Sequence, residues 1–168
     1  MERHGRTAER RQESVWDFPL PPRPERTDLR AQVIQYGFVI ADSVETLRVL
    51  QRGIAPTYYF PPEDVERVYL VPSGHTTECP FKGMADYFDV VVGDSAVPDA
   101  AWTYADPLPP FAAIAGCLSF YPALLDACLL DGEPARRERD DTTGGWITPG
   151  VLGLSKGYPR TWDRIEDA

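Results

Sequence analysis

Short apolar runs, rich in β-branched and aromatic residues, recur along the chain from residue 32 onward. Each run spans four to six residues, the length of a strand, and glycine, proline or paired polar residues separate the runs. The predicted strands are 33–36, 38–41, 46–50, 57–60, 68–71, 87–92 and 101–104. The turns predicted between them lie at Gly37, Asp42-Ser43, Gly53, Pro61-Pro62, Ser73-Gly74 and Gly93-Asp94-Ser95. The pattern is that of a chain built mainly from short strands.

Helical signals are few. Pro62 followed by two acidic residues favours one helical turn at 62–65, and a second short helix is predicted at 110–116. The chain has neither an internal repeat nor a heptad pattern. We therefore expect a mainly β chain, a single compact small-sheet fold with one or two short helices and extended N- and C-terminal arms.

Proline and charge divide the chain into segments. Seventeen prolines disfavour long helices, and four of them lie between residues 19 and 24 among many charged residues. We expect a disordered tail at 1–12, a Pro-rich extended arm at 13–30, a β core domain at 31–134 and a C-terminal arm with a Gly-Gly-Trp motif at 135–168. Trp16 and Trp146 would then pack both arms back across the sheet and cover its edges.

Composition narrows the partners and the compartment. The formal net charge of -9 argues against binding to a nucleic-acid backbone. The longest apolar stretch, 111–125, is too short to span a membrane, and the first 30 residues lack the apolar core of a signal peptide. Three irregularly spaced cysteines do not form a disulfide framework. We expect a cytoplasmic protein that contacts neither nucleic acid nor membrane.

Cys79 and Lys82 are the candidate catalytic residues. The chain has 15 arginines but only two lysines, Lys82 and Lys156, each followed by glycine. A lysine side chain has a compact ammonium whose pKa shifts readily, and it favours the thiolate of a nearby cysteine. The alternatives stay open, because Cys79 could equally be a small core side chain and Lys82 the cap of a turn closed by Gly83.

Aromatic residues gather in neighbouring predicted strands. Alternation places Tyr58 and Phe60 on one face of their strand and Tyr59 on the other. One aromatic set is expected in the core, and we hypothesise that the other lines a pocket floored by Arg48 and Lys82. Core packing alone would also explain the cluster, and a fixed ion pair would equally explain Arg48. The candidate ligand-binding residues are Arg48, Tyr58, Tyr59, Tyr87 and Trp102.

The sequence argues against metal and hydrolase chemistry. No Cys-x-x-Cys pair occurs, His4 lies in the predicted tail, and only His75 and Cys79 are clustered candidate ligands. No nucleophile elbow accompanies the single histidine of the chain's body. Cys117 and Cys128 stand beside leucines and are predicted core residues. We expect neither metal nor cofactor.

Seven motifs in order along the chain resemble those of domain of unknown function family 427. They are Glu13-Ser-Val-Trp16-Asp-Phe-Pro19, Ile40-Ala-Asp42-Ser, Leu47-Arg48-Val-Leu, Pro56-Thr-Tyr-Tyr59-Phe-Pro61-Pro-Glu-Asp-Val65, Thr77-Glu-Cys79-Pro-Phe-Lys82-Gly83, Ala100-Ala-Trp102-Thr-Tyr-Ala-Asp-Pro107 and Gly144-Gly-Trp146-Ile-Thr148. The resemblance implies a compact β fold similar to the β-tent group and carries a nucleotidyltransferase label. The chain departs from the family pattern at Glu78, where histidine is frequent, and from Leu154 onward.

The residues do not favour that label. Nucleotidyl transfer needs carboxylates that hold divalent metal against phosphates, and the chain has no Asp-x-Asp pair and no phosphate-binding loop. Three hypotheses therefore remain open. They are a binding protein for a small anionic or aromatic metabolite, a non-metal enzyme that uses Cys79 or Lys82, and a protein-interaction or structural β domain without catalysis.

Overall fold

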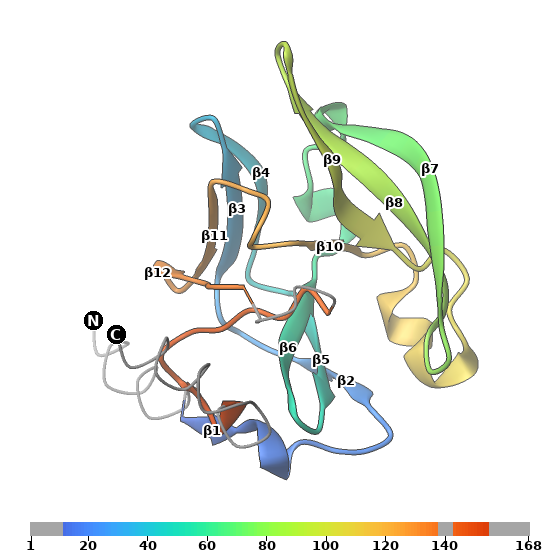
Figure 1. Cartoon of the computed structure of the whole chain (residues 1–168), viewed down its shortest axis with the longest axis vertical. Coiled ribbons are helices and arrows are strands. Elements are labelled where there is room, and N and C mark those ends of the chain that lie inside the picture. Colours follow the sequence, from blue (N-terminus) through green and yellow to red (C-terminus); the bar gives the residue numbers. More distant parts are fainter. Residues whose placement is uncertain (1–11, 138–142, 155–168) are drawn as a thin grey trace.

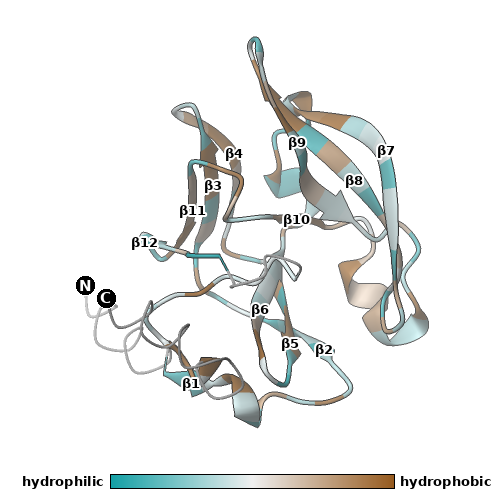
Figure 2. Ribbon diagram, viewed as in Figure 1, coloured by the Kyte–Doolittle hydropathy of each residue, from teal (hydrophilic) through white to brown (hydrophobic). Residues whose placement is uncertain are grey.

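The strands follow the alternation of side chains along the sequence. In the computed structural model, which describes residues 12–137 and 143–154, β3 (Ala31–Gln35) buries Ala31, Val33 and Gln35, while the residues between them are only half-buried. Its neighbour β4 (Phe38–Ser43) buries Ile40 and Ala41. Figure 2 shows the same alternation of polar and apolar segments along the long strands β8 (Gly83–Val92) and β9 (Ser95–Thr103). The described chain is mainly β, as expected.

Three antiparallel sheets surround the interior (Figure 1). The first has the order β2–β5–β6, with β2 (Arg23–Arg26), β5 (Leu47–Gln51) and β6 (Ile54–Tyr59). The second has the order β12–β11–β3–β4, with β11 (Ala127–Leu130) and β12 (Glu133–Pro134). The third has the order β10–β9–β8–β7, with β7 (Leu70–Cys79) and β10 (Leu118–Phe120). Figure 1 shows the second and third sheets on either side and the first beneath them.

The helical segments are short 3-10 turns, in keeping with the many prolines. Those at η2 (Pro62–Asp64) and η4 (Pro109–Ile114) lie where the sequence predicts helical turns. Two further turns, η1 (Val15–Asp17) and η3 (Arg67–Tyr69), precede strand segments. The described residues contain no helix with the length and apolarity needed to cross a membrane.

The main core lies between the sheets. Trp146 is fully buried there, its ring packs against Tyr58 and Phe60, and its Nε1–H donates to the carbonyl of Phe120. Phe60 and Leu118 exchange two backbone hydrogen bonds of 2.7 and 2.9 Å, which join the end of β6 to β10. The backbone N–H of Trp146 donates to the carbonyl of Pro56 over 2.8 Å, so the C-terminal segment lies along β6, an edge strand of the first sheet, while its indole enters the core.

Residues 13–30 lie against the sheets. β2 pairs with β5, and β1 (Glu13–Ser14) pairs in parallel with β13 (Val151–Leu152). The Nε1–H of Trp16 donates to the carbonyl of Gly153 over 2.6 Å. The arm thus supplies an edge strand to the first sheet. The predicted tail at 1–12, with His4, lies almost entirely outside the described residues, as does Lys156.

All seven predicted strands overlap observed ones, but two predicted turns are wrong. Asp42-Ser43 is the end of β4, where both residues pair with β3. Ser73-Gly74 lies inside β7, where the register to β8 shifts between Pro72 and Thr76. Gly74 has a φ of 85°, so it makes an irregularity within the strand rather than a chain reversal. As a result β7 and β8 form one long hairpin whose turn, at residues 80–82, carries Lys82.

Candidate functional site

The two faces of the β5–β6 ribbon line two separate pockets. Arg48 is paired with Tyr58 in the strand register and Leu47 with Tyr59, so these pairs alternate between the faces. Each pocket has a volume of about 470 Å³. The aromatic pocket is lined by Val49, Gln51, Ile54, Ala55, Thr57, Tyr59, Thr77, Glu78, Cys79, Pro80, Phe81, Lys82, Tyr87, Trp102, Tyr104, Tyr121 and Thr143. The Arg48 pocket is lined by Glu13, Glu25, Arg26, Thr27, Asp28, Leu29, Val44, Glu45, Thr46, Arg48, Pro56, Tyr58, Leu130, Thr148 and Val151.

The predicted site residues are thereby divided. The aromatic pocket brings together Tyr59, Cys79, Lys82, Tyr87 and Trp102. Arg48 and Tyr58 line the other pocket, so the single pocket floored by both Arg48 and Lys82 is corrected to two. The physical reason is the strand period of two, which turns Arg48 away from Tyr59.

Aromatic rings form the wall of the aromatic pocket. The ring of Trp102 lies 4.5 Å from that of Tyr121, 6.5 Å from that of Tyr87 and, edge to face, 6.3 Å from that of Tyr59. Tyr59 and Tyr104 are buried, with ring centroids 6.4 Å apart. These rings come from β6, β8, β9 and the segments that follow β9 and β10, so the wall depends on the packing of two sheets.

Phenolic hydroxyls add polar groups to this wall. The hydroxyl of Tyr87 lies 3.0 Å from Thr77 Oγ1 and 3.4 Å from the hydroxyl of Tyr121. Burial raises the pKa of Tyr59 above its ordinary value, although hydrogen bonds with Trp102 and Thr57 oppose the shift. Burial also raises the pKa of Tyr104. Both phenols are neutral at physiological pH and keep an O–H that can donate.

The β7–β8 turn places Cys79 beside Lys82. Cys79 pairs with Gly83 in the hairpin register, and Gly83, with a φ of 106°, adopts a backbone conformation that favours glycine. The amide of Leu108 donates to the carbonyl of Lys82 over 2.9 Å and ties the turn to the segment that leads into η4. Lys82 Nζ donates to Cys79 Sγ over 3.9 Å.

The ammonium of Lys82 lies among apolar and aromatic groups. Its Nζ is 5.8 Å from the ring centroid of Tyr104 and 6.0 Å from that of Phe111. Burial lowers the pKa of Lys82, while the electrostatic influence of Cys79 and its hydrogen bond act to raise it. Within residues 12–137 and 143–154, no carboxylate lies within ion-pair distance of Nζ. The carboxylate of the described lining, Glu78, belongs to an exposed residue.

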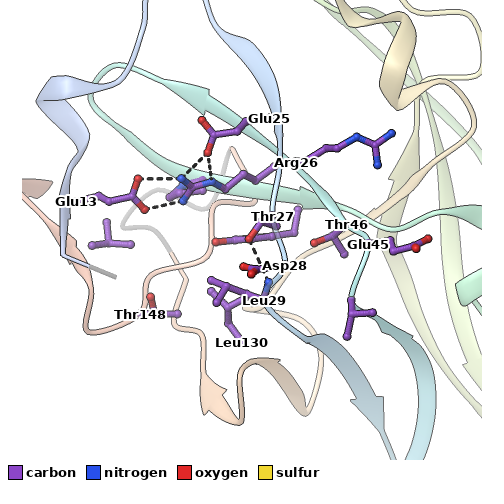
Figure 3. Close-up of a pocket in the computed structure, with 15 residues that line it drawn as sticks. Glu13, Glu25, Arg26, Thr27, Asp28, Leu29, Glu45, Thr46, Leu130 and Thr148 are labelled. Carbon is purple, nitrogen blue, oxygen red and sulfur yellow. Dashed lines mark hydrogen bonds and ion pairs between the residues drawn. The ribbon is translucent and has the colours of Figure 1, made fainter. Parts of the chain in front are cut away.

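The Arg48 pocket contains an ion-pair cluster (Figure 3). Arg48 donates to both carboxylate oxygens of Glu13, over 2.6 and 2.8 Å, and to Glu25 over 2.7 and 3.0 Å. Burial acts to lower the pKa of Arg48, but hydrogen bonds with Glu13 and Glu25 outweigh it and raise the pKa above the ordinary value. The fixed ion pair that the sequence left open is present. It joins β5 to β1 and β2.

The remaining candidates lie outside the aromatic pocket. His75 is exposed on β7, with its ring 4.8 Å from that of Tyr87. Cys117 and Cys128 are buried, as predicted, and burial raises the pKa of both thiols. No three His, Cys, Asp or Glu side chains come together as a metal-binding group in the described part of the chain.

Several residues of the aromatic pocket were missed in the sequence, among them Thr57, Thr77 and Tyr121, as was the glycine that packs on Trp102. Tyr121 lies in the apolar stretch 111–125, which carries no strand alternation, so only tertiary packing reveals it. Gly144 packs closely on Trp102, because a β-carbon built there would collide with Cη2 of the indole. The Gly144-Gly145-Trp146 motif was the available signal. A glycine beside a buried tryptophan marks a close approach of backbone to another group.

Comparisons with known proteins give a family without an established activity. No curated protein sequence matches the chain. Residues 23–131 match the model labelled NTP_transf_9, described as a domain of unknown function (DUF427). This match includes all of β2 to β11 and every predicted site residue, and it agrees with the resemblance seen in the motifs. The chain belongs to the DUF427 family.

Proposed function

We propose that this protein binds a small planar molecule with an anionic group in the aromatic pocket. The observation that carries the proposal is the position of Lys82, whose ammonium lies among aromatic rings without a carboxylate at ion-pair distance in the described residues. A cation in such surroundings gains most from an anionic partner that enters the pocket. The ligand would supply that partner.

The shape of the pocket supports the same class of ligand. A volume of about 470 Å³ falls within the range of about 300–1,000 Å³ that small-molecule sites occupy. The half-buried rings of Tyr87 and Tyr121 offer stacking surfaces beside the buried indole of Trp102, and the Tyr87 hydroxyl is a polar group at the wall. A flat ligand with oxygen substituents matches these groups.

Two other functions receive less support. A formed cavity favours ligand binding over a purely structural β domain. Nucleotidyl transfer requires several carboxylates that hold a divalent metal against phosphates. Among the described residues that line the aromatic pocket, the one carboxylate is that of Glu78, which is exposed. The Cys79–Lys82 contact of 3.9 Å does favour chemistry within the same pocket.

A thermal-shift screen of the full chain against metabolites tests the proposal. A ligand present at 100 times its Kd adds about 2.7 kcal/mol of stability, which is readily measured. We expect planar anions to be hits, and Lys82→Met to weaken their binding by about tenfold or more, since losing a charge-assisted contact costs about 1.5–3 kcal/mol.

The matched control is Lys156→Met, which removes the other lysine of the chain. Binding that survives Lys82→Met unchanged, or that is lost equally in both variants, would contradict the proposal. A Trp102→Phe variant supplies a second readout, because a ligand in this pocket quenches less tryptophan fluorescence when that indole is missing.

A further inference from the structure

Three features of Lys82 bear on its reactivity, and one of them, the hydrogen bond from Nζ to a sulfur, has no part in ion pairing with a ligand. Its side chain is half-buried in a cavity, its Nζ hydrogen-bonds to a sulfur, and aromatic rings lie next to it. A structural lysine of a hairpin turn would instead extend its ammonium into water or toward a carboxylate. Such surroundings make a lysine amine a nucleophile toward carbonyl groups.

We infer that Lys82 is a carbonyl-condensing amine, and that the ligand of the aromatic pocket carries an aldehyde or ketone group with which Nζ forms an imine. This inference rests on the proposed function, because the aromatic pocket must first bind the planar body of that ligand. Burial lowers the pKa of Lys82 and so increases the fraction of free amine at neutral pH.

The reaction balances without an added oxidant or reductant. The Lys82 ammonium gives one proton to water, and the nitrogen lone pair forms a bond to the carbonyl carbon. The carbonyl oxygen takes a proton from the nitrogen, giving a carbinolamine. The oxygen then receives the returned proton and leaves as water, while the nitrogen forms the double bond to carbon. Ammonium plus carbonyl thus gives iminium plus water, and the positive charge stays at the site.

The contacts of Lys82 suit these steps. Cys79 Sγ lies 3.9 Å from Nζ, where it accepts a hydrogen bond that holds the amine in position. The ring faces of Tyr104 and Phe111 lie near enough to stabilise a cationic nitrogen before and after condensation. A conjugated carbonyl compound would stack on the half-buried ring of Tyr121, with its reacting carbon toward the β7–β8 turn. Aromatic aldehydes are therefore the favoured substrate class.

Reductive trapping tests the inference on the full chain. The protein is incubated with 4-formylbenzoate and sodium cyanoborohydride at pH 7, digested, and mapped by mass spectrometry. The chain has two lysines, so Lys156 serves as an internal reference. We expect the adduct on Lys82 to form at least about ten times faster than on Lys156, since each unit by which a pKa falls gives about tenfold more free amine.

Two variants separate the roles of the side chains. Lys82→Arg is expected to abolish the fast adduct while leaving the slow modification of Lys156. Cys79→Ser is expected to keep the adduct on Lys82, because the amine and not the thiol is the reacting group. Equal rates at both lysines, or an adduct that disappears with Cys79→Ser but not with Lys82→Arg, would overturn the inference.

The alcohol 4-(hydroxymethyl)benzoate distinguishes failure of the chemistry from failure of the pocket. It resembles the aldehyde but cannot form an imine, and its binding is followed by tryptophan fluorescence. Saturable binding of the alcohol together with no preferential trapping of the aldehyde would leave the proposed function in place and reject the imine. Absence of both, repeated with salicylaldehyde and its alcohol, would reject both proposals.

Discussion

The guanidinium of Arg48 and the phenol of Tyr59 lie on opposite faces of the β5–β6 ribbon. Arg48 is in register with Tyr58, and Tyr59 with Leu47. Both residues were predicted from the sequence to line one ligand pocket, but only Tyr59 lines the aromatic pocket with Lys82. Arg48 instead binds Glu13 and Glu25. One face of the ribbon thus carries the ion pairs that hold the N-terminal segment, the Arg48 clamp formed by Arg48, Glu13 and Glu25, and the other face carries the candidate binding site.

Arg48→Met should therefore lower stability without affecting ligand binding in the aromatic pocket. The side chain of Arg48 is 12% exposed, and its loss leaves Glu13 and Glu25 without their shared partner. Because both carboxylates are partly solvated, we expect a loss of about 1–3 kcal/mol in the free energy of unfolding. Urea denaturation measures the loss.

Arg30→Met is the matched control for Arg48→Met. Arg30 also binds a carboxylate, Asp42, over 2.7 Å, but its side chain is 55% exposed. Solvent screening weakens such an exposed pair, so Arg30→Met should lose clearly less stability than Arg48→Met. If the two variants lose equal stability, the clamp formed by Arg48 is no stronger than a surface pair.

Gly144→Ala should disturb both stability and the aromatic pocket. Gly144 has a φ of 71°, and an added β-carbon would lie 2.2 Å from the rigid indole of Trp102. The backbone strain costs about 1–2 kcal/mol, and the forced movement of Trp102 adds about 1–3 kcal/mol. Thermal unfolding and tryptophan fluorescence report the two effects.

Gly93→Ala distinguishes the cost of backbone strain at a positive φ from the cost of the steric clash with Trp102. Gly93 also has a positive φ, of 60°, but nothing lies within 4 Å of the position of its β-carbon. It should lose only the strain, about 1–2 kcal/mol, and leave the fluorescence of Trp102 unchanged. Equal losses in both variants would mean that the approach of Gly144 to Trp102 is unimportant.

The lowered pKa of Lys82 predicts a pH-dependent contribution to stability. The folded state holds its Lys82 proton less tightly than the unfolded state, whose lysine pKa is about 10.4. Between the two pKa values the unfolded state binds more protons, so stability rises with pH. At pH values below the pKa of Lys82 in the folded state, the folded protein carries a buried ammonium, and its stability is lowered by the full cost of that burial.

The pH dependence that Lys82 contributes is best measured in a background that lacks the Cys79 thiol. Cys79→Ser and the double variant Cys79→Ser/Lys82→Met share every tyrosine near the site, so their difference isolates Lys82. As pH rises from 7 to 10, the stability of Cys79→Ser should increase relative to the double variant, by at most about 1.4 kcal/mol per pH unit. A difference that stays constant over this range would show that burial does not perturb Lys82.

The sequence predicted local structure well because strands follow a simple period. Alternation placed Tyr58 and Phe60 on one face of their strand and Tyr59 on the other, and the structure buries the first two in the main core and Tyr59 in a second cluster. The same alternation separates Arg48 from Tyr59, but the pocket hypothesis combined them because both carry attractive chemistry. The prediction of a single pocket was wrong because the residue types of Arg48 and Tyr59 were given more weight than the faces on which strand alternation puts them.

Long-range packing accounts for what the sequence could not provide. Gly74 has a φ typical of a turn, yet β7 continues past it, because the pairing with β8 resumes at Thr76. Trp146 stands in a segment without strand alternation, and only the closing of the sheets gives its indole a place in the core. The proximity of Gly144 to Trp102 likewise arises from tertiary structure alone.

The pairing of β1 with β13 has a consequence for the order of folding. The contact between Trp16 and Gly153 spans 137 residues, a separation at which the unaided meeting of two short segments is entropically costly. Once β2 has docked on β5 and Trp146 has entered the core, the distance to be searched becomes small. We therefore expect the β1–β13 pairing and the Trp16–Gly153 hydrogen bond to form late in folding, and to be the first contacts to open under denaturing conditions.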